Sequence, residues 1–369
     1  MKNNFSPLLF IFFAQLIFLA PTQVFSWGGR GHDTACETAV YLVQNKTLKD
    51  FLRNKPNMMG HLCNIPDISW RSLDANKTKE GNPTHYVEGE PIGLALKDLP
   101  TDLKAIIEKY SKTDNKINPK AQILSVPHEL GTNWWRANQL FDLSVTEGKK
   151  LKTLDAPKNS KEEQNDNLPY NIALFQMLSH MGVMGHFVGD NSMPFHTSAD
   201  YDGYAVGHGG IHAYYEDLCV SYFGSNLSSL IEQKSNQIKK TSLIKKMLNE
   251  KSTLEKMKAL GIISNDEITK VLKLDPIIKK SELKEEKGMK IKTAAERKPA
   301  EAGQKIYSAL IIEQLARSAL LLANLWDQIY IDIGSPELKA YKSYRYPLAP
   351  EFVMPDYYDI KPIESKTNK

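Results

Sequence analysis

Five side chains of the kind that bind metal ions lie close together in this sequence. His186 and Asp190 are four residues apart, and so are His212 and Glu216, which places each pair on one face of a helix. His196 lies between the two pairs. Imidazole and carboxylate groups are ligands that zinc accepts. One such pair is usually a solvated ion pair, but two pairs around a third histidine indicate a metal site.

Helices must position these ligands. An apolar segment that begins near Pro169 has helical periodicity and carries the first pair. Pro194 cannot continue that helix, so the chain should turn there and bring His196 back towards the first pair. A second dense apolar pattern, Ala302–Tyr330, is suited to pack against the first helix. We therefore expect two long helices that pack against each other.

The N-terminus resembles a secretory signal peptide. Lys2 is the only charged residue among residues 1–26, Leu8–Leu19 is apolar, and Ser26 fits the small-residue rule for cleavage. We expect cleavage before Trp27 and a secreted or periplasmic protein. The new α-amine would bind a metal ion when neutral, and the amine and carbonyl of Trp27 could chelate one ion together with His32.

The charge is unevenly distributed along the chain. Residues 234–298 hold twice as many basic as acidic residues, so the rest of the mature chain is acidic. An acidic body argues against a general nucleic-acid-binding surface, although bound zinc ions would reverse the sign locally. The basic segment contains amphipathic helix patterns such as Leu243–Leu260. It is either a solvated helical insertion or an interfacial helix that meets an anionic membrane.

These features divide the chain into four parts. Residues 1–26 form the signal peptide, and residues 27–224 form the helical domain that bears the metal ligands. Residues 225–300 form a Lys-rich helical insertion. Residues 301–369 contribute a core helix and a tail to the ligand-bearing domain. After the signal, no uninterrupted apolar stretch reaches the length of about 18 residues that predicts a membrane span.

Three cysteines remain after cleavage, at Cys36, Cys63 and Cys219. An exported compartment permits one disulfide between two of them, and the sequence leaves the pairing open. Because cysteine is scarce, any metal site must be built from His, Asp and Glu.

Other histidines and two tryptophans have more than one interpretation. His208 could replace His212 as a ligand. His180 lies on the opposite side of the first helix from the ligand pair and should be structural. Trp134 and Trp135 either line a groove or belong to the core.

Asp67 and His85 are ambiguous by themselves, because Asp67 fits a helix cap or turn and His85 the start of a strand or helix. Together with the other candidates they resemble the ligand set of the trinuclear zinc superfamily, which contains secreted zinc-dependent phospholipases C and single-strand-specific zinc nucleases. The resemblance covers Trp27 to about Tyr222, with the C-terminal helix as a weaker match, and leaves residues 225–300 outside it. Its members are Trp27, His32, Asp67, His85, His186, Asp190, His196, His212 and Glu216.

The resemblance implies a single all-α domain with three Zn²⁺ ions per chain in a cleft between helices. It implies that one ion is held by Asp67, His85, His186 and Asp190. A second ion would be held by the Trp27 amine and carbonyl, His32 and the bridging Asp190. A third would be held by His196, His212 and Glu216. Asp67, as a base, and Asp190, as the bridge, would be the catalytic residues.

The two branches of the superfamily are both represented. Glu216 as the last ligand and the short spacing from His196 to His212 resemble the phospholipases. His32 only five residues after Trp27, and the Pro66–Trp70 and His85–Glu88 segments, resemble the nucleases. The acidic body and the basic amphipathic insertion favour a lipid substrate over an extended polyanion.

From these features we expect a secreted zinc-dependent phospholipase C, a hydrolase that cleaves the phosphodiester of phospholipids at a membrane surface. The first alternative is a zinc-dependent single-strand nuclease or 3′-nucleotidase that binds single-stranded nucleic acid. The second is a non-catalytic, zinc-loaded membrane-binding module. No obligate protein partner is indicated by the sequence.

Overall fold

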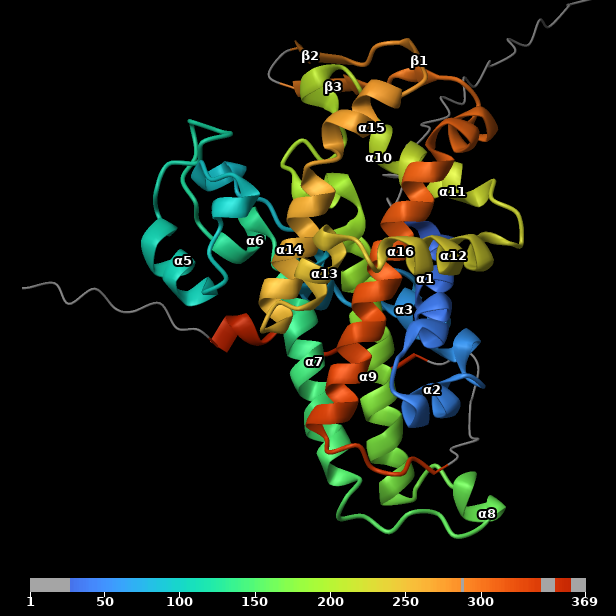
Figure 1. The fold of residues 1–369 in the computed structure, drawn as a ribbon. Coiled ribbons are helices and arrows are strands. Elements are labelled where there is room, and N and C mark those ends of the chain that lie inside the picture. The colour runs from blue at the N-terminus through green and yellow to red at the C-terminus, as the bar shows by residue number, and fades with distance from the viewer. Residues whose placement is uncertain (1–26, 287–288, 340–348, 360–369) are drawn as a thin grey trace, which may run out of the picture.

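The computed structural model describes residues 27–286, 289–339 and 349–359 (Figure 1). Helices account for 65% of the chain and strands for 5%, so the fold is all-α, as predicted. The signal peptide, residues 1–26, lies outside the described residues and stays a prediction.

The secondary structure elements are mostly helices of very different lengths. The α-helices are α1 (Gly28–Leu42), α2 (Lys46–Leu52), α3 (Pro56–Ile68), α4 (Ala75–Gly81), α5 (Leu103–Tyr110), α6 (Val126–Leu130), α7 (Asn133–Lys150), α8 (Ser160–Glu163), α9 (Pro169–Ser192), α10 (Ile211–Ala213), α11 (Cys219–Ser221), α12 (Leu227–Ile238), α13 (Ser242–Leu248), α14 (Thr253–Asn265), α15 (Ile268–Leu274) and α16 (Ala300–Asp332). The 3₁₀ helices are η1 (Trp70–Ser72), η2 (Asn82–His85), η3 (Glu90–Ile92), η4 (Leu96–Asp98), η5 (Pro194–Thr197), η6 (Tyr204–Val206) and η8 (Asp356–Asp359). A π-helix, η7 (Tyr214–Leu218), follows α10. The strands are β1 (Ile277–Lys279), β2 (Glu282–Glu286), β3 (Met289–Thr293) and β4 (Glu296–Arg297).

The core is built around the two long apolar helices, α9 and α16. Helix α9 packs against α7, α3 and α16, and α16 also packs against α1 and α12 (Figure 1). Both helices are long and apolar enough to cross a membrane, with mean hydropathies of 1.2 and 1.4 over their most apolar windows. However, 78% and 72% of those windows are buried inside the bundle. A helix that is apolar all round is expected in such a core.

The ends of α9 follow from two prolines. Pro169 occupies the first turn, where its missing N–H costs nothing. At the other end Met193 leaves the helix with φ −87° and ψ 119°, the extended backbone that a following proline favours. Pro194 then opens η5, which carries His196. The turn predicted at Pro194 is therefore confirmed.

Two glycines let α1 and α3 approach α9 closely. A Cβ added to Gly189 would lie 2.6 Å from His32 Nδ1, and one added to Gly185 would lie 2.4 Å from Cys36 Sγ. A disulfide joins Cys36 to Cys63, which links α1 to α3, and Cys219 is free and buried. The structure thus settles the pairing that the sequence left open.

The Lys-rich insertion, residues 225–300, packs onto the bundle. Helix α12 contacts α16 and α1, and α14 contacts α7, α9 and η5. The single amphipathic helix expected over Leu243–Leu260 is instead two helices, because Ser252 caps a new helix start by accepting a hydrogen bond from Glu255 N at 3.2 Å. Apolar residues of both helices are buried, namely Ile244, Met247, Met257 and Leu260.

The Lys/Glu-rich end of the insertion forms strands rather than helix. β1 pairs with β4, and β2 pairs with β3, both antiparallel. Leu283 lies opposite Lys292, and Lys284 opposite Ile291. Apolar Met289 and Ile291 alternate with Lys290 and Lys292 in the sequence, which is the two-residue period of a strand.

Candidate metal centre

Three groups of buried side chains in the described part of the chain could each hold a metal ion. In each group, ligand atoms from the three side chains lie within 4.8 Å of one another. Every side-chain ligand predicted from the sequence belongs to one of them. The groups are His32–His186–Asp190, Asp67–His85–His186 and His196–His212–Glu216, called here the first, second and third groups.

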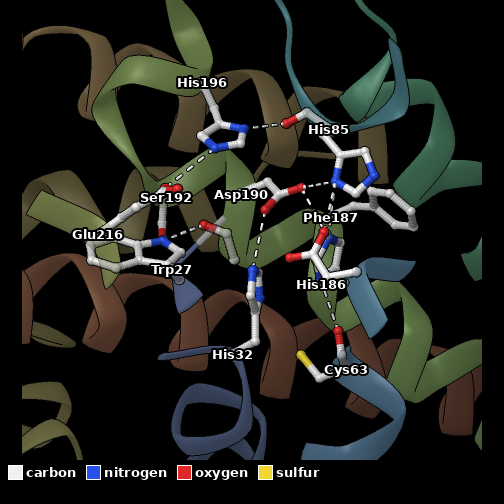
Figure 2. Close-up of polar contacts among 12 residues, drawn as sticks. Trp27, His32, Cys63, His85, His186, Phe187, Asp190, Ser192, His196 and Glu216 are labelled. Atoms are coloured by element: carbon white, nitrogen blue, oxygen red, sulfur yellow. Dashed lines mark hydrogen bonds and ion pairs between the residues drawn. The ribbon is translucent and has the colours of Figure 1, made fainter. Parts of the chain in front are cut away.

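Asp190 lies between the first and second groups and directs one oxygen to each (Figure 2). Its Oδ1 is 3.3 Å from His32 Nε2. Its Oδ2 is 3.0 Å from His85 Nδ1 and 3.4 Å from His186 Nε2. The helix places Asp190 one turn after His186, as the four-residue spacing predicted. This geometry suits a carboxylate that bridges two ions.

Backbone carbonyls orient three of the histidine rings. His186 Nδ1 lies 2.9 Å from Cys63 O, and His196 Nδ1 lies 2.7 Å from His85 O. His212 Nδ1 lies 3.0 Å from Tyr201 O. Because a carbonyl oxygen only accepts, we assign the proton to Nδ1 in each ring, which leaves Nε2 with a lone pair. Such contacts fix the tautomer and orientation of metal-binding histidines.

Ring nitrogens of neighbouring histidines face each other. His196 Nε2 and His212 Nε2 are 3.1 Å apart, and His186 Nε2 lies 3.0 Å from His85 Nδ1. Two ring nitrogens at such distances repel unless a proton or a metal cation lies between them. This convergence fits metal binding.

Unsatisfied buried atoms provide a second test of that fit. Both ring nitrogens of His32 and both carboxylate oxygens of Glu216 are buried and make no hydrogen bond. Yet Glu216 Oε1 lies 2.8 Å from His212 Nε2, and Oε2 lies 3.5 Å from His196 Nε2. Buried polar atoms that make no hydrogen bond destabilise the folded state. Atoms that bind one metal ion, in contrast, are expected to lie close together without the geometry of hydrogen bonds between them. The residues therefore fit a bound metal ion.

The local electrostatics keep most of the first two groups deprotonated. Burial holds the pKa of His186 well below its usual value, and burial also lowers the pKa of His85. For Asp190, burial acts in the opposite sense, but His186 and His196 overcome it and hold the pKa of the carboxyl well below its usual range. Deprotonated imidazole and carboxylate are the forms that bind metals.

His196 in the third group behaves differently. Burial opposes its protonation, but the charge of Asp190 and the adjacent Glu216 carboxylate raise the pKa of His196 to about 9. The metal-free chain therefore holds a proton on this ring at neutral pH. A metal ion that binds the third group must displace that proton.

Glu216 lies in a π-helical turn, η7, rather than in the α-helix expected from its spacing to His212. Single π-turns often occur at functional sites. The wider turn still brings the carboxylate to His212, as described above. The sequence predicted the pair but not the type of helix.

Trp27 is fully buried beside the site. Its indole Nε1 donates to Gly189 O at 2.8 Å and to Ser192 Oγ at 3.1 Å (Figure 2). Its ring packs against Tyr215, 6.0 Å between centroids, next to the ligand Glu216. The side chain thus fixes the start of α1 at the metal centre. Chelation by the Trp27 amine and carbonyl depends on cleavage and stays a prediction.

The other ambiguous residues now have places. His208 lies outside the three groups, 2.8 Å from Asp275 Oδ2, and His180 lies outside them too. Trp134 and Trp135 are buried, so they belong to the core rather than to a groove. The interpretation of His180 as structural agrees with its position.

A pocket of about 360 Å³ opens beside the third group. Three aromatic side chains line it, as do the carboxyl groups of Glu88 and Glu129. Both Glu129 oxygens already accept hydrogen bonds, from Leu124 N at 2.7 Å and Asn115 Nδ2 at 3.0 Å. Burial, and then the neighbouring Glu90, raise the pKa of Glu88 to about 8. The lining residues are Tyr86, Glu88, His128, Glu129, Phe195, His196, Ala199, Tyr201 and His212.

Arg71 was not predicted to belong to the site, yet its Nε lies 2.8 Å from Asp67 Oδ1. The four-residue spacing from Asp67 was an available signal. Burial raises the pKa of Asp67, and Arg71 acts against that shift. Arg71 therefore helps to keep this ligand ionised.

Replacing Arg71 should weaken metal binding without abolishing it. We expect Arg71→Gln to lower the metal affinity of the second group by about 10-fold to 100-fold, the range typical of residues that orient a ligand. Competition with a chelator measures this affinity. Arg53→Gln is the control, because Arg53 is exposed and its Nη1 lies 3.8 Å from Asp50 Oδ1, an exposed carboxylate. Equal affinities in both variants and the parent would contradict this role for Arg71.

Compared with known protein families and curated proteins, the chain matches no family model and no curated sequence. The structure itself establishes an all-α fold with three buried His/Asp/Glu groups that could hold metal ions. The nature of the metal and the reaction are matters for proposal.

Proposed function

We propose that this protein is a zinc-dependent phosphodiesterase that acts on single-stranded nucleic acid or 3′-nucleotides. The observation that carries the substrate class is the pocket beside the third group, which is lined by three aromatic rings and by the carboxyl groups of Glu88 and Glu129. Phosphodiester chemistry is supported by the adjoining first and second groups, which share His186 and are spanned by Asp190.

Zinc suits this donor set, since it binds imidazole and carboxylate and needs no cysteine. Divalent ions at such paired sites supply Lewis acidity, which makes water a better nucleophile near neutral pH and offsets the negative charge of a phosphate ester. They also make the acidic body locally positive.

The chain's own residues then orient the reaction. Arg71 occupies Asp67 Oδ1, and Asp67 Oδ2 is buried without a hydrogen bond. Oδ2 is therefore the oxygen that can accept the proton of the attacking water. Burial of the site excludes other solvent, and the aromatic pocket holds the group next to the scissile phosphate.

The chemistry of the pocket favours a nucleobase. Aromatic rings such as Tyr86 and Tyr201 offer faces on which a base can stack. A neutral Glu88 carboxyl presents a donor and an acceptor side by side, which complements the edge of a base. Aromatic rings can also bind a quaternary ammonium headgroup through cation–π contacts, but such a headgroup has no hydrogen-bonding edge to match a neutral Glu88 carboxyl.

The packing of the insertion also bears on the substrate. On sequence, the acidic body and the basic amphipathic insertion favoured a lipid substrate. In the structure, Ile244 and Met247 of α13 and Met257 and Leu260 of α14 are buried against the protein, whereas Leu243 is exposed. The four buried side chains are therefore not available for insertion into a bilayer.

A phospholipase C is the second candidate. Glu88 and Glu129 lie among aromatic rings in the pocket, and if Glu88 is ionised this arrangement would bind a cationic headgroup. Glu216 as the last ligand also resembles the phospholipases.

One assay separates the candidates. The zinc-loaded chain beginning at Trp27 is offered single-stranded DNA, single-stranded RNA, a 3′-nucleotide and phosphatidylcholine micelles. We expect zinc-dependent cleavage of the nucleic acids and release of phosphate from the nucleotide. Release of phosphocholine alone would establish the second candidate. Liposome binding with no turnover of any substrate would establish the membrane-binding module.

The pH dependence of substrate binding should report on Glu88. Below about pH 8 its carboxyl is neutral and donates a hydrogen bond, and this donor is lost as the pH rises through that pKa. We expect KM for a single-stranded substrate to rise over this interval in the parent and to stay flat in Glu88→Gln, whose amide keeps a donor and an acceptor. Glu88→Ala should raise KM about tenfold at pH 7, the loss of roughly one hydrogen bond.

The matched control for this measurement is Glu108→Gln, on the exposed side of α5. It should reproduce the parent's profile. If Glu88→Gln also reproduced it, Glu88 would have no part in substrate recognition.

A further inference from the structure

The loop between His196 and His212 contains little regular structure of its own. It runs from Ser198 to Gly210 and includes three glycines with positive φ, at 74°, 82° and 83°. The last of them, Gly210, caps α10 and stands two residues before His212. Within the loop, His212 Nδ1 lies 3.0 Å from Tyr201 O, and His212 N donates to Asp202 Oδ1 at 3.2 Å. Because a backbone with several positive-φ glycines has many accessible conformations, the loop must itself be held if these contacts are to fix His212.

The loop is held by residues 275–286 and 289–298, called here the clamp segment, at the end of the insertion. Ser281 N donates to Gly207 O at 3.0 Å, and Gly209 N donates to Ser281 Oγ at 2.9 Å. Ala295 N donates to Gly209 O, also at 2.9 Å. The turn just before α10 is therefore held by residues on both sides of the hairpin.

A buried ion pair forms the centre of this contact. Arg297 donates through Nε and Nη2 to the two oxygens of Asp275, at 2.8 and 3.0 Å. Its remaining donors reach the carbonyl oxygens of His208 and Gly209. The Asp275 side chain is fully buried and that of Arg297 is 5% exposed. The fork of a guanidinium is suited to this simultaneous binding, and lysine cannot reproduce it.

The pair is also tied to the helix that carries Glu216. The Arg297 guanidinium lies over the Tyr214 ring at 5.3 Å, and Tyr214 OH donates to Lys298 O at 2.8 Å. One side chain thus contacts the elements that precede and follow His212. A buried ion pair gains little net stability because of desolvation, but it can select one conformation.

We propose that the clamp segment positions His212, with Arg297, Asp275 and Ser281 as the positioning residues for metal binding at the third group. The inference rests on the proposed metal-dependent function. It assigns a role to the insertion, which lies outside the family resemblance: the insertion sets the affinity of one of three ions.

The test measures metal affinity rather than activity. Zinc stoichiometry and affinities are determined by chelator competition for the full mature chain, Arg297→Lys, His212→Ala and the double variant. We expect Arg297→Lys to weaken one ion by about 10-fold to 100-fold and to leave the other two unchanged. In the His212→Ala background, Arg297→Lys should have no further effect, because the affected ion is already lost.

A milder variant guards against misfolding. Ser281→Ala removes a single hydrogen bond and should weaken the same ion by a smaller factor, while exchange of the Gly209 amide hydrogen becomes faster. Lys284→Met is the control, since Lys284 pairs with Glu282 on the exposed hairpin, and it should leave all three affinities unchanged.

Unchanged affinities in both Arg297→Lys and Ser281→Ala would overturn the role of the clamp segment, as would equal weakening of all three ions. Failure of the proposed function has a different signature. The parent would then bind no ion at the third group, and His212→Ala would not change its stoichiometry.

Discussion

Asp190→Asn is expected to lower kcat/KM for a phosphodiester substrate by about 10³-fold or more, the scale on which removal of a central electrostatic group acts. Asp190 is the residue whose two oxygens reach both the first and second groups. Asparagine keeps the size but removes the charge and replaces one oxygen with an amide nitrogen, which cannot bind a cation. The same change should lower the number of zinc ions retained.

The control for this prediction is Asp142→Asn on α7, where the carboxylate accepts a hydrogen bond from Asn138. Activity and zinc content should both be unchanged. An Asp190→Asn protein that kept full zinc content and most of its activity would show that the bridge between the two groups is not needed for catalysis.

Removal of the metal ions is expected to lower the unfolding midpoint by more than about 10 °C. A ligand present at about 1,000 times its Kd stabilises the folded state by about 4 kcal/mol per site, and several sites add. The structure supplies a reason for tight binding, because buried atoms of His32 and Glu216 make no hydrogen bond and the Nε2 atoms of His196 and His212 face each other at 3.1 Å. Circular dichroism with and without a chelator measures the shift.

His212→Ala provides the comparison. This variant lacks one site, so the chelator should shift its midpoint less than that of the parent. Re-addition of zinc should restore the parent's midpoint. Equal midpoints for the parent with and without chelator would exclude a stabilising metal centre.

Local patterns in the sequence predicted much of the site. The spacing of His186 and Asp190, and of His212 and Glu216, follows from helix geometry alone, and Pro194 was expected to end its helix because it cannot continue the hydrogen-bond ladder. Periodicity predicted the two long apolar helices, whereas the all-α class was implied by the family resemblance. Asp67 and His85 were different, because no local pattern connects them to His186, and only the resemblance of the whole set drew them in.

Several features depended on contacts between residues distant in the sequence. The sequence permitted any pairing of the three cysteines, whereas the packing of α1 and α3 at Gly185 brings Cys36 and Cys63 together. The carbonyls that orient the histidines come from Cys63, His85 and Tyr201. A backbone carbonyl carries no sequence signature, so these contacts could not be predicted.

The sequence by itself determined the ligand pairs His186–Asp190 and His212–Glu216, because each pair depends on side-chain type and short-range spacing. Only the tertiary structure decided that Glu88 is half-buried at a pocket beside the third group, and that the insertion holds the turn before His212. Those properties arise from burial and from contacts between distant segments, and the free energy of such contacts depends on packing that no local pattern encodes.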